Sequence, residues 1–273
     1  TDVATAQVAI QAAPPYWHSW YRMARHYTEA AYELDIQGGE ASTGEASALR
    51  TFGVSCLKRA TELNPLHYQL PYEVARTRFQ MGGMVDKEVR DAFRKAASLA
   101  PRRRDIWHEW LKAEIENGNM ETVAEVAEFA REQASEKIAV SLWEQVYEIH
   151  KENDNLRQSY EAVRRLNEIQ PNNYRMLRRQ SKLELRMGLT RAACLSLAKA
   201  CEANPESHDA WFELGRIELE RGKDLQANQA FMKAIRLKPS LRKKVDELWE
   251  KHKTGPRSSS GGRSGSLTPH LNF

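Results

Sequence analysis

Apolar residues recur at spacings of three and four along most of the chain, which is the period of a helix with one buried face. In the segment 240–253, Leu241, Val245, Leu248 and Trp249 fall on one such face. Short polar or glycine-containing stretches separate these runs and join them in pairs. The pattern predicts helices at 2–13, 15–35, 47–63, 67–81, 86–99, 104–117, 120–135, 139–152, 155–169, 173–187, 190–203, 207–221, 224–237 and 240–253.

Prolines punctuate this pattern at nearly constant intervals. Pro171, Pro205 and Pro239 are spaced 34 residues apart, and Pro65 and Pro101 precede them at similar places in the pattern. Proline stops a helix because it lacks an N–H donor and clashes with the preceding turn. A period of 34 residues with such stops is the signature of a helix–turn–helix repeat. We therefore expect an all-α, right-handed α-solenoid of about five helix pairs, with 240–253 as a C-terminal capping helix.

Three regions differ in character along the chain. Residues 1–65 read as a divergent, expanded segment, in which 36–46 is expected to be a Gly/Ser/Thr loop. Its first run, 2–13, resembles a second helix without a first one, so we expect the chain to be truncated upstream. Residues 66–253 hold the regular array and its capping helix. Residues 254–273 are rich in Gly, Ser and Arg and are expected to be disordered.

The last repeat carries a recognisable motif, which runs Trp211-x2-Leu214-Gly215, Ala227-x3-Phe231 and Pro239. Over residues 66–239 the chain resembles the tetratricopeptide repeat (TPR) family, although Glu218 stands where that family has tyrosine. The small residues Gly215 and Ala227 would let paired helices approach closely. The resemblance implies a non-catalytic scaffold that binds a protein or peptide in its concave groove.

Two further resemblances leave other functions open. The segment "IWHEWLKAEIENGN" is similar to a half-a-tetratricopeptide repeat, which is common in RNA-processing scaffolds. The aromatic stretch "PPYWHSWYRMARHY" and the repeat after it resemble the start of the C-terminal TPR region in bacterial O-antigen ligase/polymerase-type membrane proteins. In that case any catalytic or membrane region would precede Thr1, and membrane association would come only through it.

A basic stripe on the predicted helix 173–187 is the candidate binding site. Its residues share one helical face and would line the groove together with Arg216; they are Arg175, Arg178, Arg179, Lys182 and Arg186. A basic groove could hold an acidic peptide through charge-assisted hydrogen bonds. The alternative is an ion-pair ladder between repeats, because Glu144, Glu148 and Glu152 precede Arg178, Lys182 and Arg186 by 34 residues each. Both interpretations remain open.

Composition adds mainly exclusions. The formal net charge is +4 over 273 residues, too small to indicate nucleic acid as a partner. No HExxH, CxxC or glycine-rich phosphate loop occurs, and the eight histidines are scattered, so we expect no catalytic, cofactor or metal site. The basic run 101–105 reads as a solvated loop. The localisation stays undetermined.

Two residue groups are expected to pack in the interior. Tyr16, Trp17, Trp20 and Tyr21 have helical spacing and are interpreted as packing residues, with an exposed aromatic patch as the alternative. The three cysteines, Cys56, Cys194 and Cys201, are interpreted as small buried helix residues. The last two are seven apart on one helix, too distant for a disulfide.

Overall fold

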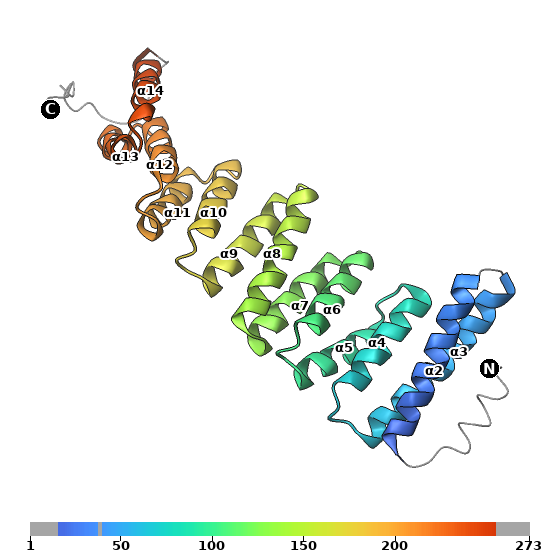
Figure 1. The fold of residues 1–273 in the computed structure, drawn as a ribbon. Coiled ribbons are helices and arrows are strands. Elements are labelled where there is room, and N and C mark those ends of the chain that lie inside the picture. The colour runs from blue at the N-terminus through green and yellow to red at the C-terminus, as the bar shows by residue number, and fades with distance from the viewer. Residues whose placement is uncertain (1–15, 38–39, 255–273) are drawn as a thin grey trace. The chain divides into compact units, whose positions relative to one another are not determined.

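The computed structural model describes residues 16–37 and 40–254, which form thirteen α-helices and one short 3-10 helix and contain no strand (Figure 1). The chain falls into two compact units, Thr1–Pro171 (unit 1) and Asn172–Phe273 (unit 2), which are described one at a time. The boundary predicted at residue 65 lies inside unit 1 and stays a prediction. The predicted helix 2–13 and, but for Thr254, the predicted disordered tail lie outside the described residues.

Consecutive helices in each unit are paired, which confirms the all-α fold with TPR-like helix pairs. Unit 1 contains the pairs α2 (Trp17–Gln37) and α3 (Glu40–Leu63), α4 (Gln69–Gly82) and α5 (Lys87–Leu99), α6 (Arg104–Glu116) and α7 (Met120–Gln133), α8 (Glu136–Glu152) and α9 (Leu156–Ile169). Unit 2 contains α10 (Tyr174–Arg186) and α11 (Thr190–Ala203), α12 (His208–Glu220) and α13 (Asp224–Leu237), then η1 (Pro239–Leu241) and α14 (Arg242–Thr254).

The proline turns are held by tryptophan as well as by proline itself. The indole N–H of Trp107 donates to the carbonyl of Pro101 at 3.0 Å, and Trp211 donates to the carbonyl of Pro205 at 2.9 Å. Each tryptophan lies six residues after its proline, in the first helix of the next pair. The hydrogen bond ties the turn to that helix, so the chain enters both repeats in the same way.

The tight turn inside a pair depends on a left-handed residue. Gly118, Gly188 and Gly222 have φ of 76°, 75° and 69°, and Asp154 takes the same place in its repeat with φ 53°. A Cβ added at any of these glycines would meet nothing within 4 Å. Backbone conformation rather than crowding therefore favours glycine, and aspartate is among the few residues that tolerate it.

The predicted loop at 36–46 is wrong, because most of it is helical. Helix α2 continues to Gln37 and α3 begins at Glu40, so the first pair gains its length from helices of 21 and 24 residues. The segment contains two Ala and two Glu, which are strong helix formers. Their preference outweighs the cost of about 1 kcal/mol for Gly44 in a helix.

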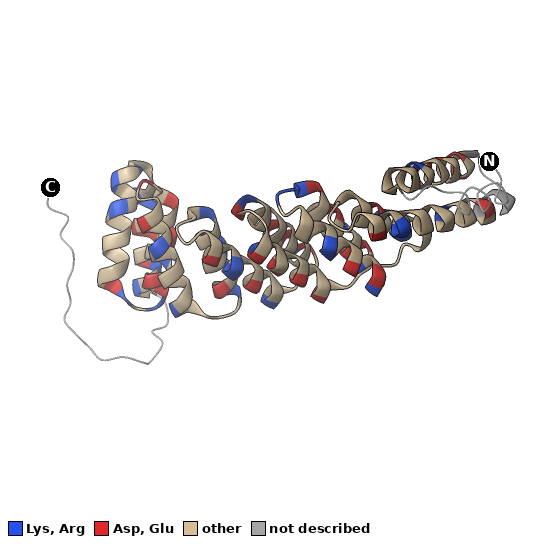
Figure 2. Ribbon diagram, turned by 90° about the horizontal axis from the view of Figure 1, so that it is seen from below, with Lys and Arg blue, Asp and Glu red and all other residues tan. Residues whose placement is uncertain are grey.

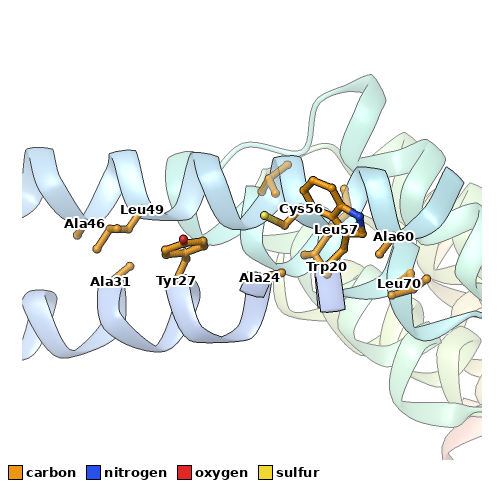
Figure 3. Packing of buried hydrophobic residues seen from close by; sticks show 12 residues of the cluster. Trp20, Ala24, Tyr27, Ala31, Ala46, Leu49, Cys56, Leu57, Ala60 and Leu70 are labelled. Carbon is orange, nitrogen blue, oxygen red and sulfur yellow. The ribbon is translucent and has the colours of Figure 1, made fainter. Parts of the chain in front are cut away.

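Small residues let these two long helices pack closely (Figure 3). Ala24, Ala31, Ala46 and Ala60 are buried in a cluster with Trp20. The expected packing of the N-terminal aromatic residues is confirmed for Trp20, Trp17 and Tyr21, which are buried or partly buried against this cluster. The first of the aromatic residues differs, since Tyr16 is 68% exposed.

In unit 2, α14 covers the end of the last pair as the capping helix that the pattern predicts. Val245 of α14 is buried together with Phe231 of α13 and Leu219 of α12, and Trp249 packs against the same cluster. The rings of Phe231 and Trp249 have centroids 6.4 Å apart. Without α14, this apolar end would face water.

The three cysteines are free thiols inside the helix pairs, which confirms their interpretation as small buried residues. Burial raises the pKa of Cys56 and Cys194 to about 11 and that of Cys201 to about 12. Desolvation is the largest cause in each case, because it disfavours the thiolate. The thiols are therefore protonated at neutral pH.

Candidate protein-interaction site

The candidate basic stripe lies on α10, which Asn173 starts by accepting hydrogen bonds from the backbone N–H groups of Arg175 and Met176. Met176, Leu177 and Leu183 are buried on one side of this helix. The stripe occupies another side, where Arg175, Lys182 and Arg186 are exposed or partly exposed and Arg178 is half-buried. The helical phase predicted from sequence thus puts these three stripe residues in contact with water.

Arg178 is not free to contact a ligand, because α12 already holds it. Its guanidinium donates to Glu213 at 2.7 Å and to the hydroxyl of Tyr174 at 3.2 Å, and it lies 5.6 Å from the centroid of the Tyr174 ring. Tyr174 in turn bonds Ser207, the residue that caps α12. These contacts join the first helix of one repeat to the first helix of the next.

Arg216 and the exposed stripe residues have different surroundings. Arg216, on α12, forms an ion pair with Glu220 at 2.6 Å one turn along the same helix. Among the described residues, Arg175 and Lys182 have no ion-pair partner. The predicted ladder from Glu144 to Arg178 and its two equivalents would join unit 1 to unit 2, and it stays a prediction.

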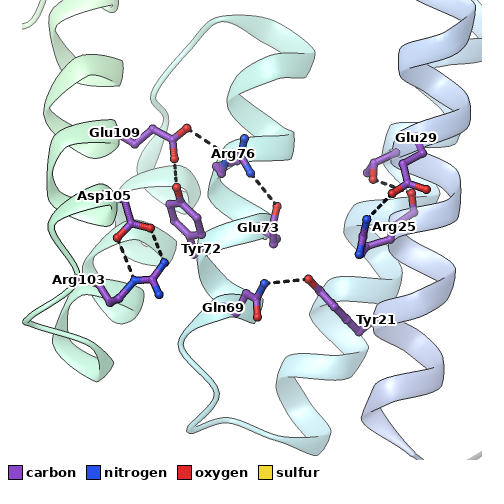
Figure 4. Close-up of polar contacts among 11 residues, drawn as sticks. Tyr21, Arg25, Glu29, Gln69, Tyr72, Glu73, Arg76, Arg103, Asp105 and Glu109 are labelled. Carbon is purple, nitrogen blue, oxygen red and sulfur yellow. Dashed lines mark hydrogen bonds and ion pairs between the residues drawn. The ribbon is translucent and has the colours of Figure 1, made fainter.

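The contacts of Arg178 recur in unit 1 (Figure 4). Arg76 lies 3.2 Å from Glu109 of the next first helix and 5.5 Å from the ring centroid of Tyr72, whose hydroxyl donates to the same carboxylate. Burial and that hydrogen bond raise the pKa of Tyr72.

Tyr72 and Arg76 precede Tyr174 and Arg178 by 102 residues, which is three times 34. A search for identical residues at multiples of the repeat would have found this pair, but reading single helices did not. Because its arginines are already engaged, the arrangement connects repeats and is not itself a ligand site.

Polar contacts continue along the first helices of unit 1. The side chain of Gln69 donates to the Tyr21 hydroxyl at 3.0 Å, which joins α4 to α2 (Figure 4). Between α6 and α8, His108 contacts Gln145 at 2.7 Å and Ser141 at 3.4 Å. Burial and the nearby Arg104 lower the pKa of His108, so its imidazole is neutral at pH 7. Most of the polar side chains named on these first helices are therefore engaged in contacts within the protein.

The basic run 101–105 is exposed at the start of α6, as expected for a solvated segment. Arg103 forms an ion pair with Asp105 at 2.7 Å, and its guanidinium lies 5.4 Å from the ring centroid of Tyr68. Positions of Lys or Arg and of Asp or Glu are interspersed along the ribbons of both units (Figure 2).

A buried polar position went unnoticed in the sequence. It falls at equivalent places in four successive first helices: Glu114, His150 and Glu184 are buried, and Glu218 is partly buried. Glu114 is fully buried, and it accepts hydrogen bonds from Arg90 at 2.9 and 3.1 Å, from Trp110 at 3.2 Å and from Thr122 at 2.8 Å. The signal was Glu218, which departs from the tyrosine of the TPR motif. A buried carboxylate with all of these partners is unavailable to a ligand, and removing one partner would leave a buried charge uncompensated.

Within the described ranges, no cluster of three or more His, Cys, Asp or Glu side chains is arranged to hold a metal ion. None of the described helices is both long and apolar enough to cross a bilayer.

No protein-family model and no curated protein matches the chain. Among solved structures, the chain is similar to MamA (12% identity, 76% of this chain and 98% of that one, TM-score 0.33). It is also similar to YrrB, a TPR protein with an unusual peptide-binding site (13% identity, 90% and 97% coverage, TM-score 0.33). A third is a thermophilic TPR protein from Thermus thermophilus (14% identity, 83% and 99% coverage, TM-score 0.33).

At these identities and TM-scores, the fold assignment rests on the helix pairs themselves. The O-antigen ligase/polymerase and RNA-processing resemblances gain no support from these neighbours. What the chain shows is an array of paired helices whose last repeat resembles the tetratricopeptide motif except at Glu218.

Proposed function

We propose that the chain is a non-catalytic scaffold that binds a protein or peptide along the first helices of its repeats, and that unit 2 takes an acidic segment. The observation that carries this proposal is that only some cations of the basic stripe are engaged in contacts within the protein. Arg178 is engaged with Glu213, whereas Arg175 and Lys182 are exposed and have no ion-pair partner among the described residues. Two cations about two turns apart on one face of α10, with an engaged arginine between them, suit an extended ligand with spaced carboxylates.

Arg186 and Arg216 extend the same proposed surface. Both are at least partly exposed, and the pair of Arg216 with Glu220 joins neighbouring turns of one helix. Exposed pairs of this kind contribute about 0–1 kcal/mol, so a ligand carboxylate could replace Glu220 at little cost. No observation on the described residues favours a membrane polymer-assembly protein or an RNA-processing scaffold over this function.

The test is a charge reversal at the two available cations. Arg175→Glu combined with Lys182→Glu is expected to weaken binding of fluorescein-labelled Asp/Glu-rich peptides about tenfold, measured by fluorescence anisotropy at low salt. The control combines Lys199→Glu with Lys243→Glu. These two residues lie on α11 and α14, away from the stripe, and are exposed. Both double variants replace two cations by carboxylates, so the net charge of the protein changes equally. An equal loss in both variants, or none in the first, would refute the proposed surface.

A further inference from the structure

A pocket on the second helices of unit 2 has no role in the preceding site. It has a volume of about 710 Å³ and lies between one face of α11 and one face of α13, with Trp211 of α12 contributing to its lining. Ligand pockets in proteins commonly have volumes of about 300–1,000 Å³. The basic stripe of α10 contributes no residue to it.

Apolar side chains line this pocket although water can reach them. Leu195 of α11 is 62% exposed and Met232 of α13 is 43% exposed, and Ala198 adds a partly buried apolar position one turn after Leu195. Single exposed apolar residues are ordinary on protein surfaces. Two large ones on separate helices that line the same cavity form a place for an apolar side chain of a partner.

The pocket also has a clear excess of positive charge. Arg191, Lys233 and Arg236 line it and are at least partly exposed, whereas its one carboxylate, Glu218, accepts a hydrogen bond from Arg221 at 2.8 Å. Apolar and cationic groups therefore occur together, and the complementary ligand is apolar and anionic.

Lys233 places a positive charge next to an apolar part of the pocket lining. Its ammonium lies 4.0 Å from the ring centroid of Trp211, close enough for a cation–π contact. The charge is held over the wall of the cavity, where it can meet a carboxylate next to a bound apolar side chain.

We infer that this pocket binds an acidic peptide segment that carries a bulky apolar side chain, as a second interaction surface independent of the first-helix site. Leu195 and Met232 contact the apolar side chain, and Arg191, Lys233 and Arg236 contact the flanking carboxylates. A nucleic acid strand fits the pocket less well. Such ligands stack their bases on aromatic rings, and the ring of Trp211 already carries Lys233.

The experiment uses the full chain and short fluorescein-labelled peptides that combine several Asp or Glu residues with one Phe or Leu. Met232→Glu places a carboxylate in the apolar part of the pocket and is expected to weaken binding about tenfold in fluorescence anisotropy. The matched control is Leu225→Glu. It makes the same kind of change on the same helix at a residue that is 67% exposed and does not line the pocket, and it should leave the affinity unchanged.

Two further measurements make the inference falsifiable. Replacing the Phe or Leu of the peptide by Ser should abolish the difference in affinity between Met232→Glu and the parent. Arg175→Glu with Lys182→Glu should leave intact the part of the binding that depends on Met232 and on the Phe or Leu of the peptide. Circular dichroism establishes that each variant is folded. The inference is overturned if no such peptide binds, if Met232→Glu and Leu225→Glu behave alike, or if only single-stranded oligouridine binds in a Met232-dependent way.

Discussion

Because Gly215 has only a hydrogen atom as its side chain, α12 can approach α13 closely at this position. A Cβ at this position would lie 2.6 Å from Cδ1 of Phe231, which is far inside van der Waals contact. Phe231 is itself buried and also packs near Trp249, so its ring has little room to move. The motif's requirement for a small residue here is thus a requirement of packing rather than of backbone conformation.

Gly215→Ala is therefore expected to destabilise unit 2 by about 1–3 kcal/mol, the usual cost of overpacking a well-filled core. Urea denaturation followed by circular dichroism measures the change. Gly44→Ala is the matched control, because a Cβ at Gly44, also within a helix, would meet nothing within 4 Å. That variant should be more stable than the parent by about 0.5–1 kcal/mol. Equal effects from the two substitutions would contradict the close approach at Gly215.

At the scale of the element, one side chain at a helix terminus can both cap its own helix and bond a neighbouring one. Asp86 precedes α5, and its side chain accepts a hydrogen bond from the N–H of Val89 at 2.8 Å while Arg78 donates to its other oxygen at 2.8 Å. The hydrogen bond from Val89, and then that from Arg78, lower the pKa of Asp86 against the opposing effect of partial burial. The charged carboxylate therefore caps the helix and also joins it to α4.

A lowered pKa in the folded state means that this cap stabilises the protein above the ordinary aspartate pKa of about 4, and that the benefit is lost as pH falls through the lower folded value. Asp86→Ala should cost about 0.5–2 kcal/mol at pH 7. The difference from the parent should shrink as the solution is acidified below pH ~4. Asp86→Asn keeps a cap acceptor and should lose less at neutral pH. Urea midpoints across pH provide the measurement, and a pH-independent difference would exclude a charged cap.

The sequence predicts those elements whose causes are local. Pro205 and Gly222 act on their own turns, so helix ends and pair turns could be read from residue type and spacing. The loop expected at 36–46 is wrong because its Gly, Ser and Thr residues do not prevent the Ala and Glu among them from forming a helix. In the candidate site, exposure of Arg175 and Lys182 followed from helical phase. The engagement of Arg178 by Glu213 depends on lateral packing of helices whose contacting residues lie 35 positions apart in sequence.

At the scale of the whole molecule, each unit is a stack in which a helix pair contacts mainly its neighbours. Stability in such arrays is roughly a sum of repeat and interface contributions, and a terminal helix protects the open end. In unit 2 that helix is α14, whose buried residue is Val245. The helix is amphipathic and ends in basic residues, so one side packs on the last pair and the other faces water.

Val245→Asp is expected to weaken the contact of α14 with the last pair and to speed amide hydrogen exchange in α12 and α13. Unit 1 should keep its protection, because the effect passes only between neighbouring pairs. Lys243→Asp is the control, since it adds a carboxylate at an exposed position of the same helix. Hydrogen exchange with mass spectrometry resolves the helices. Loss of protection in both units would show that the chain opens as one cooperative body.

The buried cysteines have a consequence for how the chain can be observed. Each unit holds at least one protonated thiol, Cys56 in unit 1 and Cys194 with Cys201 in unit 2, and alkylating reagents react with the thiolate of an accessible cysteine. Modification then requires the surrounding helices to separate first. The rate at which each cysteine is alkylated therefore measures how often its own unit opens. No probe has to be introduced into the chain for this measurement.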